Sequence, residues 1–348
     1  MWAPSIARAS CSWTDQHPCG HEEWENPPDT TPNLAALATT GHLRIIQIIN
    51  YALPELPDEL RACHELEQLI LIYTKTVRFP SWAKELRHLE YMQVILTRLL
   101  MLSWLTDKCV PSHIEGDFTS RQLVSMPDDL FEDMHSLVFL HLGSLIQISR
   151  VPDLRNLTRL RFLLLALLHA VTELPSLEGL ASLRSVSIVD AAQVHELPPI
   201  SKLHLQFFAL AGRNPVCCNG FMTESCDLSD HQCQAHDDER PVECTAKRYS
   251  TPDLALATSI PGIVCEQNLT IHLKDMAPTV ELTDVACGGV MHKQCELNGI
   301  VGMCFNARMT VVSCVVSAEY ENMRRLQIAR GVAEPCDPKV EAWLGCTK

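Results

Sequence analysis

Apolar residues recur along this chain with a period of about 23 positions. Each period is marked by an apolar residue followed by proline, or in one case by serine. The successive pairs are separated by 23, 23, 24, 25, 23 and 23 residues. Such regular spacing indicates an internal repeat and predicts a stacked, coil-like architecture. The pairs are Leu56-Pro57, Phe79-Pro80, Leu102-Ser103, Met126-Pro127, Val151-Pro152, Leu174-Pro175 and Leu197-Pro198.

A short strand is predicted ahead of most of these pairs. There the pattern apolar-x-x-apolar-x-apolar points alternate side chains to one face, as in a half-buried strand. The proline that follows has a fixed backbone angle, which suits a connecting turn. The chain then returns through apolar residues such as Leu154 and Leu157, which completes one turn of a coil. The strand positions are Leu43, Ile46 and Ile48; Leu66, Leu69 and Leu71; Leu89, Met92 and Val94; Leu137, Leu140 and Leu142; Leu160, Leu163 and Leu165; and Leu183, Val186 and Ile188.

One 23-residue turn cannot bury its apolar stripe alone, whereas stacked turns share one continuous core. The pattern over residues 41–213 resembles the leucine-rich repeats of about 23 residues that carry Leu-Pro on the return path. The resemblance implies an α/β solenoid of about seven turns with a parallel sheet on its concave face. Two features depart from it: the usual asparagine after the strand is mostly replaced, and the turn with Cys109 lacks a clean strand pattern. The alternative is an ordinary α/β domain with leucine-rich helices.

The 16 cysteines are unevenly distributed, and a change of composition near Arg213 predicts a domain boundary. We expect an N-terminal segment or cap at 1–40, the solenoid at 41–213 and a disulfide-rich C-terminal module at 214–348. So many thiols favour an oxidising compartment, where disulfides stabilise small domains by constraining the unfolded chain. The first four cysteines of the module are expected to pin a cap on the solenoid. Disulfides of open connectivity are predicted for Cys217, Cys218, Cys226, Cys233, Cys244, Cys265, Cys287, Cys295, Cys304, Cys314, Cys336 and Cys346.

A zinc site around Cys226, His231, Cys233, His236 and Cys244 is the alternative for the start of this module. The spacing lacks the paired Cys-x-x-Cys arrangement of zinc knuckles, so disulfides are favoured. The acidic run that follows His236 lacks the alternating spacing of calcium loops and is expected to be a solvated loop. No metal site and no cofactor are predicted.

Near the C-terminus, residues 319–330 predict a helix, with Tyr320, Met323, Leu326 and Ile328 near one face and a glycine as the stop. Asp337 and Pro338 predict the start of a second short helix, with aspartate as its cap and proline as its first residue. The chain then ends in Trp-Leu-Gly-Cys, followed by two residues.

These C-terminal residues carry a more specific resemblance. The stretch Arg324–Ile328, the Cys-Asp-Pro at 336–338 and the Trp-Leu-Gly-Cys at 343–346 resemble a family of oomycete leucine-rich-repeat proteins with a WLGC-type C-terminal module. The Cys-Cys-Asn-Gly at 217–220 and the Gly-Gly-Val at 288–290 fit the same family. The resemblance implies a secreted or membrane-tethered protein, and it supplies no catalytic residues.

The net charge of −14 argues against nucleic acid and anionic lipid as partners, because both are bound through clustered Lys and Arg. The longest apolar run, 162–168, falls far short of the roughly 20 residues of a transmembrane span. Residues 1–10 lack the apolar core of a secretory signal. We nevertheless expect an extracellular or cell-surface location, although a signal or anchor is not seen in this sequence. Glycosylation is predicted at the sequons of Asn156 and Asn268.

The residues between the strand leucines are expected to line the concave face in three columns. The first column runs Ile45, Gln68, Tyr91, Phe139, Phe162 and Ser185. The second runs Gln47, Ile70, Gln93, His141, Leu164 and Ser187, and the third Ile49, Ile72, Ile95, Gly143, Ala166 and Val189. Hardly any charge appears, so we predict binding of a protein or peptide there. The candidate partner-binding residues are Tyr91, Phe139, His141, Phe162 and Leu164.

The alternative for this face is that the N-terminal segment or the cysteine-rich module covers it. His141 is assigned no chemistry, because a single histidine among apolar neighbours usually serves packing or hydrogen bonding. Motifs of nucleophile elbows, phosphate loops and metalloprotease helices are missing, so no enzymatic activity is expected. The sequence therefore predicts non-enzymatic recognition by an extracellular or membrane-associated protein. An intracellular signalling scaffold with reduced or zinc-bound cysteines is the alternative.

Overall fold

The computed structural model describes residues 27–96, 123–223, 225–234, 240–265, 284–297, 299–307, 311–316, 318–331 and 335–347. The chain divides into two compact units, which consist chiefly of Asp29–Thr270 and of Ile271–Lys348. The first unit thus extends past the composition change near residue 213. The cysteine-rich part of the sequence is accordingly shared between the two units.

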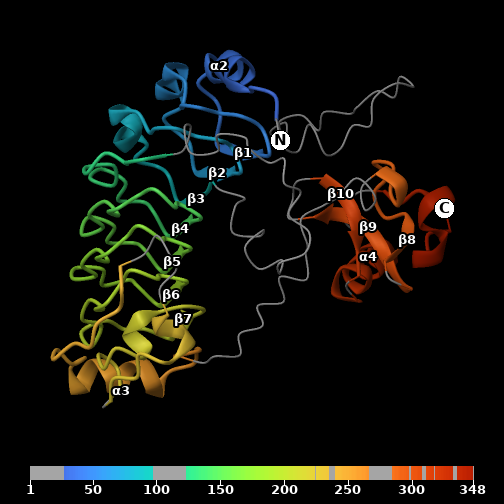
Figure 1. The fold of residues 1–348 in the computed structure, drawn as a ribbon. Helices are drawn as coiled ribbons and strands as arrows, with labels where there is room; N and C mark the ends of the chain where they lie inside the picture. The colour runs from blue at the N-terminus through green and yellow to red at the C-terminus, as the bar shows by residue number, and fades with distance from the viewer. Residues whose placement is uncertain are drawn as a thin grey trace. The chain divides into compact units, whose positions relative to one another are not determined.

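A parallel seven-stranded sheet forms one side of the first unit (Figure 1). Its strands follow one another in chain order, with each paired in register to the next, as the repeat predicts. The strands are β1 (Ile45–Ile49), β2 (Gln68–Ile72), β3 (Tyr91–Ile95), β4 (Phe139–Gly143), β5 (Phe162–Ala166), β6 (Ser185–Val189) and β7 (Phe207–Ala211). The leucine-rich-repeat solenoid is therefore the fold of this unit.

The assignment of the turns needs one correction. Strand β4 pairs directly with β3, so the connection between them adds no strand to this part of the sheet. The predicted repeat with Leu102-Ser103 lies outside the described residues, and the seventh strand is instead β7. Six turns therefore join seven strands. The physical reason is that the stretch with Cys109 lacks the apolar-x-x-apolar-x-apolar pattern that a strand of this sheet needs to bury one face.

The core of the solenoid consists of the leucine positions that the pattern marks. Leu69, Leu140 and Leu163 point inward from their strands and are buried, while Leu154 and Leu157 are buried on the return path. The pairs Leu56-Pro57 and Phe79-Pro80 lead into the 3-10 helices η1 (Asp58–Ala62) and η2 (Ser81–Glu85) in the first turns. All these side chains belong to one continuous hydrophobic cluster, which is how stacked repeats share their stability.

The first turn carries an N-terminal cap. Helix α2 (Thr31–Ala38) buries Leu34 and Ala38 in the core. The chain just before the helix pairs with the first turn through a hydrogen bond from Thr30 N–H to Ala52 C=O, at 2.9 Å. This segment covers apolar residues that the first repeat would otherwise expose.

The last turn is closed by a second cap, formed by helix α3 (Thr251–Ser259) and the segment after it. Asp253 accepts hydrogen bonds from the backbone N–H groups of Ile200 and Ser201, at 2.8 and 2.6 Å. Residues 261–265 run along β7, where Leu210 N–H donates to Ile263 C=O at 2.6 Å. The free edge of the last strand is thereby paired.

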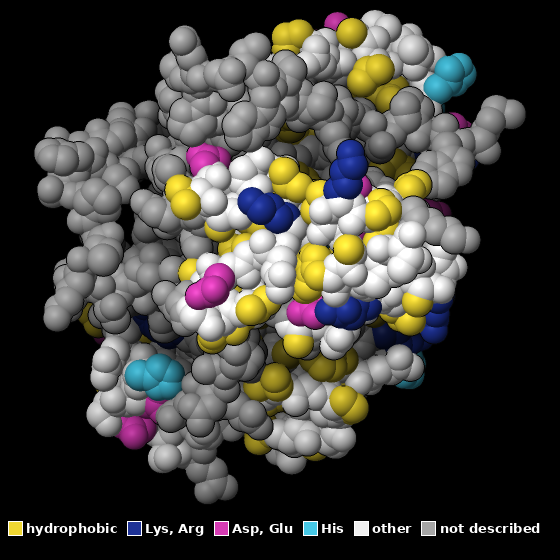
Figure 2. Space-filling view, turned by 90° about the vertical axis from the view of Figure 1, so that its right-hand side faces the viewer, with side chains coloured by type: hydrophobic (Ala, Val, Ile, Leu, Met, Phe, Trp, Pro, Cys, Tyr) yellow, Lys and Arg dark blue, Asp and Glu magenta, His cyan; other side chains and the backbone are white. Residues whose placement is uncertain are grey.

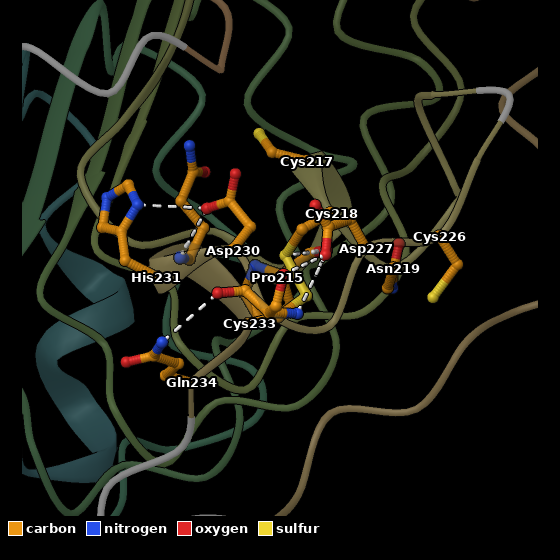
Figure 3. Close-up of a disulfide and its surroundings, with 12 residues drawn as sticks. Pro215, Cys217, Cys218, Asn219, Cys226, Asp227, Asp230, His231, Cys233 and Gln234 are labelled. Atoms are coloured by element: carbon orange, nitrogen blue, oxygen red, sulfur yellow. Dashed lines mark hydrogen bonds and ion pairs between the residues drawn. A yellow bond between two sulfur atoms is a disulfide. The ribbon is translucent and has the colours of Figure 1, made fainter.

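Three disulfides hold the loops of this cap. They join Cys217 to Cys265, Cys218 to Cys233 and Cys226 to Cys244. Figure 3 shows the second pair, in which Cys218, the residue after η4 (Pro215–Cys217), is bonded to Cys233 of η5 (His231–Cys233), with Asp230 beside His231. The three cysteines weighed as zinc ligands are thus all in disulfides, Cys226 with Cys244 and Cys233 with Cys218, and His236 lies outside the described residues.

The second unit is a small antiparallel sheet with helices. Strand β9 (Ile300–Ala307) lies between β8 (Gln294–Leu297) and β10 (Val311–Val315), and helices α4 (Ala318–Arg330), α5 (Pro338–Glu341) and η7 (Ala342–Leu344) follow. Three disulfides join Cys287 to Cys304, Cys295 to Cys314 and Cys336 to Cys346. The predicted cap of α5 is confirmed, because the Asp337 side chain accepts from Lys339 N–H.

The predicted helix at 319–330 is present as α4, but its expected apolar face is wrong. Met323 and Leu326 are 41% and 49% exposed, whereas Arg324 is buried. The guanidinium of Arg324 makes two hydrogen bonds, of 2.6 and 2.9 Å, to the buried carboxylate of Glu341. The burial of a charged side chain costs hydration free energy, and here the opposite charge and the hydrogen bonds of Glu341 offset that cost.

Candidate recognition surface

The sheet brings the three predicted columns together in register. Tyr91 pairs with Phe139, and Phe139 pairs with Phe162, so the candidate aromatic residues stand side by side on neighbouring strands. His141 and Leu164 are partners in the second column. These residues are far apart in the sequence, but the parallel register of the strands places their side chains on one surface.

The surface includes one aromatic residue that the sequence reasoning missed. Phe207 pairs with Ser185 and therefore continues the first column onto β7. Its side chain is 37% exposed, and Phe162 and Ile45 in the same column are 46% and 48% exposed. The signal that could have found Phe207 is the pattern Leu205, Phe208 and Leu210 at β7. This pattern places Phe208 inward and therefore Phe207 outward.

The aromatic rings of the first column pack on one another across the strands. The rings of Tyr91 and Phe139 are stacked, with centroids 4.2 Å apart and an interplanar angle of 1°. Phe162 lies beside Phe139 in a tilted arrangement, with centroids 6.3 Å apart. Because Tyr91 and Phe139 cover one face of each other, a ligand can reach only the opposite faces and the edges of these two rings. Ring edges carry the positive part of the aromatic quadrupole.

A chain of hydrogen bonds runs across the same strands. The Tyr91 hydroxyl donates to Oε1 of Gln93 at 3.2 Å, and Nε2 of Gln93 lies 3.1 Å from Nδ1 of His141. Because an amide nitrogen only donates, Nδ1 accepts here, and the proton of a neutral ring is then on Nε2. Gly143 leaves room for this ring, since a Cβ there would lie 3.0 Å from Nε2.

Burial determines the charge state of this polar chain. Desolvation lowers the pKa of His141 from 6.5 to about 4, so the imidazole is neutral at physiological pH. Burial also raises the pKa of Tyr91, which keeps its phenol protonated. The centre of the concave face therefore offers hydrogen-bonding groups without a net charge.

Charged side chains are instead found at the positions just before the strands. There a ladder of backbone hydrogen bonds runs from turn to turn, for example from Arg161 N–H to Val138 C=O and from Arg184 N–H to Arg161 C=O. Arg44 and Glu67 form an ion pair in this row. The row is basic at Arg44, acidic at Glu67 and Glu90, and basic again at Arg161 and Arg184. It gives one margin of the sheet a charge that changes sign along the solenoid.

Elsewhere the described surface is mixed. On the side shown in Figure 2, hydrophobic side chains are interspersed with single acidic and basic ones, and neither sign dominates. No helix in the described parts of the chain is both long and apolar enough to span a bilayer. A cleft of about 460 Å³ lies beside the last turns and includes Gln193, His195, Arg240 and Lys247. Lys247 is paired there with Glu196 at 2.8 Å.

One of the two predicted glycosylation sites, Asn156, lies among the described residues. Asn156 is half-buried on the return path, and its side-chain amide donates to Glu132 C=O at 3.1 Å. Asn268 lies outside the described residues. Cys63 is buried in the solenoid core, and its sulfur is 3.4 Å from Ala38 C=O.

Two comparisons with known proteins gave matches to this chain. The model of the WLGC domain matches residues 282–347. A leucine-rich-repeat protein of Leptospira interrogans is similar in structure, with 16% identity and a TM-score of 0.22, over 70% of this chain and 73% of that one. A TM-score this low carries no argument, so the solenoid assignment rests on the register of its own sheet.

No curated protein matches the chain. In the matched segment, Trp343 donates from Nε1 to His292 C=O at 3.0 Å, and Leu344 is buried. Gly345 has a φ of 97°, and Cys346 is bonded to Cys336. Each residue of the Trp-Leu-Gly-Cys motif thus has a structural role in the second unit. The chain therefore carries a leucine-rich-repeat solenoid, followed by a segment at residues 282–347 that matches the WLGC domain.

Proposed function

We propose that this protein is a non-enzymatic recognition protein that binds a protein or peptide on the concave sheet. The observation that carries the proposal is the uncharged face itself. Its aromatic column is exposed in part, although the chain as a whole carries a net charge of −14. Leucine-rich-repeat solenoids commonly bind partners on this face, and partly exposed aromatic residues make effective anchors.

The chemistry of the face favours an uncharged partner segment with aromatic or methionine side chains. An ionised group would lose hydration against Phe139 and Phe162 and gain no counter-charge in the columns. Backbone carbonyls and the faces of a partner's rings would meet the positive edges of Tyr91 and Phe139. Gln93 and His141 add hydrogen bonds beside the aromatic anchors. The row of charges along the strand starts would orient the partner along the solenoid.

The proposed setting is the extracellular space or the cell surface. Six disulfide pairs among the described cysteines support it, because such bonds persist in oxidising compartments. The resemblance to the oomycete family with a WLGC-type module supports it too, as do the sequons of Asn156 and Asn268, which we propose to be glycosylated. An intracellular scaffold with reduced or zinc-bound cysteines is the competing assignment.

Photo-crosslinking identifies the partner and tests the face in one experiment. A photoreactive phenylalanine analogue is placed at Phe162 in one protein and at Val124 in another. Val124 is a suitable control because it is 61% exposed and lies outside the sheet. We expect a crosslinked partner only from position 162. Equal crosslinking from both positions would contradict binding on the concave face.

The affinity for that partner is then measured for Phe139→Glu/Phe162→Glu and for Val124→Glu. We expect the double variant to lose at least about 2 kcal/mol of binding free energy, as for other interface anchors. The control should bind as the unmodified protein does. Circular dichroism establishes that both variants are folded, and unchanged affinity of a folded double variant would exclude the face.

The setting is tested by mass spectrometry of the protein from its native source, before and after reduction. Nearly complete disulfide bonding with a glycan on Asn156 or Asn268 would support an extracellular location. Free thiols or bound zinc without glycans would support the intracellular scaffold instead.

A further inference from the structure

The second unit gathers four cysteines on one side of its small sheet. Cys304 on β9 and Cys314 on β10 are direct cross-strand partners. Cys295 on β8 is opposite Gly302, two residues before Cys304, so the three strand cysteines share one face. Cys287 comes from the turn that precedes β8. Four thiol-bearing residues therefore converge from three strands and one turn.

Three of the four sulfur atoms lie close enough to one another to bind one metal ion. The sulfurs of Cys287, Cys295 and Cys304 are all within 4.8 Å of one another. The sulfur of Cys314 is bonded to that of Cys295 and therefore lies beside this group of three. All four residues are at most 8% exposed, and together they form the hydrophobic core of this sheet. Within the described ranges, this is where three or more such sulfurs meet.

This arrangement is close to what a tetrahedral metal site requires. Zinc binds four thiolates at about 2.3 Å, which places the sulfur atoms about 3.8 Å apart. The backbone already brings the sulfurs of Cys287, Cys295 and Cys304 near that scale, and the sulfur of Cys314 is bonded to that of Cys295. Once a reductant has supplied two electrons and two protons to each disulfide, small rotations of the side chains would separate the four sulfurs to this distance. The sequence spacing hides the site, because no Cys-x-x-Cys occurs among these residues.

We propose that the reduced form of this unit binds one Zn²⁺ through Cys287, Cys295, Cys304 and Cys314. Four thiols lose their protons and four Zn–S bonds form, so that four protons are released and no electrons are transferred. The two disulfides are the alternative state of the same sulfurs, which forms when each pair loses two electrons and two protons to an oxidant such as a protein disulfide. The inference does not depend on the proposed recognition function.

The proposal gives the unit two ways to hold its sheet together. The sheet is small and its core consists largely of these cysteines, so it needs a covalent or metal crosslink for stability. Metal binding would provide the crosslink where thiols stay reduced, and disulfides would provide it where they are oxidised. Cys336 and Cys346 belong to neither state of this site, because they pair with each other elsewhere in the unit.

The test is a titration of the full-length chain with Co²⁺, after reduction with a phosphine under anaerobic conditions. Co²⁺ occupies zinc sites and reports their geometry by its absorption spectrum. We expect one Co²⁺ per chain with the bands of a tetrahedral tetrathiolate site, displaced by one equivalent of Zn²⁺. A spectrum without tetrahedral thiolate bands would overturn the proposal.

Variants assign the signal to these residues. Cys295→Ser/Cys314→Ser should lose the tetrahedral site, whereas the matched control Cys336→Ser/Cys346→Ser should retain it. Cys295→His keeps a ligand and should retain a tetrahedral spectrum with weaker thiolate bands, which distinguishes ligation from a failure to fold. The proposal is wrong if Cys295→Ser/Cys314→Ser keeps the full signal, if the control loses it, or if Cys295→His loses it.

Discussion

At the scale of single residues, the solenoid tolerates strain at one repeated position. The residue after a strand adopts a left-handed backbone conformation, with φ of 54° at Asn50, 55° at Tyr73, 53° at Ser144 and 56° at Leu167. Asparagine enters this region readily, whereas leucine does so at a cost. The hydrogen bond from Leu167 N–H to Val189 C=O, at 2.7 Å, holds the turn to its neighbour. The contacts between neighbouring turns therefore hold the left-handed conformation at positions that lack the asparagine usual in this repeat.

The neutral state of His141 makes stability depend on pH. Its pKa is lowered from 6.5 to about 4 by burial, so the unfolded chain binds a proton between these values that the folded chain does not. The free energy of unfolding should therefore fall as pH falls through this window, by about 2 kcal/mol near pH 5 relative to neutral pH. Urea denaturation of His141→Gln should lack this component.

His135→Gln is the matched control, because His135 is exposed and contacts only a backbone carbonyl, at 3.2 Å, in the bonds observed. It should keep the pH dependence of the unmodified protein. Carboxylates contribute to all three proteins equally, so the differences isolate the histidine. Identical pH profiles for His141→Gln and the unmodified protein would show that His141 is not desolvated.

At the scale of elements, the C-terminal cap depends on one glycine. Gly262 lies against β7, and a Cβ there would be 1.7 Å from Phe208 C=O, in a backbone conformation with φ of 152°. Phe208 N–H donates to Pro261 C=O at 3.1 Å beside it. Only a residue without a side chain lets the cap approach the strand this closely.

Gly262→Ala should displace the cap segment and expose the edge of β7. We expect a loss of about 1 to 3 kcal/mol in the free energy of unfolding, together with self-association through the exposed edge. Denaturation and light scattering measure the two effects. Gly289→Ala is the control, because Gly289 also has a positive φ but open space where its Cβ would be. Equal effects of the two changes would mean that strain, not the close approach, is responsible.

In the second unit, the ion pair of Arg324 and Glu341 joins helix α4 to helix α5. Burial by itself raises the pKa of Glu341, but the hydrogen bonds from Arg324 and Asp337 N–H outweigh it, and the pKa is lowered overall. This pair should stabilise the unit at neutral pH and lose its contribution as pH falls through the lowered pKa.

Arg324→Met leaves a buried carboxylate without its cation and should cost about 3 to 5 kcal/mol. Hydrogen exchange of the amides in β8, β9 and β10 measures the stability of this unit separately. Arg325→Met is the matched control on the same helix, because the Arg325 side chain is 41% exposed and pairs with Glu321 at the surface. It should cost less than about 1 kcal/mol. Protection that survives Arg324→Met would show that the pair does not hold the helices together.

At the scale of the whole molecule, the charged residues lie outside the surface that we propose for recognition. The chain carries a net charge of −14, yet the three columns of the concave sheet contain no ionisable residue except a neutral histidine and a protonated tyrosine. The charges nearest the sheet lie in the row before the strands. Attraction or repulsion at a distance therefore affects how a partner approaches, while the contacts on the sheet determine how long it stays.

The dissociation rate of the partner should accordingly change little with salt. Raising ionic strength from about 0.05 M to about 0.5 M shortens the screening length several-fold and should alter mainly the association rate. Surface plasmon resonance with the partner identified by crosslinking measures both rates. A dissociation rate that rises strongly with salt would show that ion pairs, not the uncharged face, hold the complex.

The periodicity of the sequence was sufficient to determine the solenoid and its concave columns. Register follows from period, because each turn repeats the same inward leucines, and so Phe139 and Phe162 could be placed side by side in advance. The turns after β3 were harder, since residues 97–122 keep the length of a repeat without its strand pattern. Sequence also indicated which twelve cysteines form disulfides, but not their partners.

Tertiary structure decided what depends on contacts between distant residues. The stack of Tyr91 on Phe139 and the bond between Gln93 and His141 span 48 positions, and only the direct pairing of β3 with β4 brings them together. Arg324 is buried although it is charged, because Glu341 lies opposite it. The meeting of four sulfurs likewise results from strand pairing. A local pattern encodes which face of an element is apolar, whereas the neighbour that this face meets is determined by the folded chain.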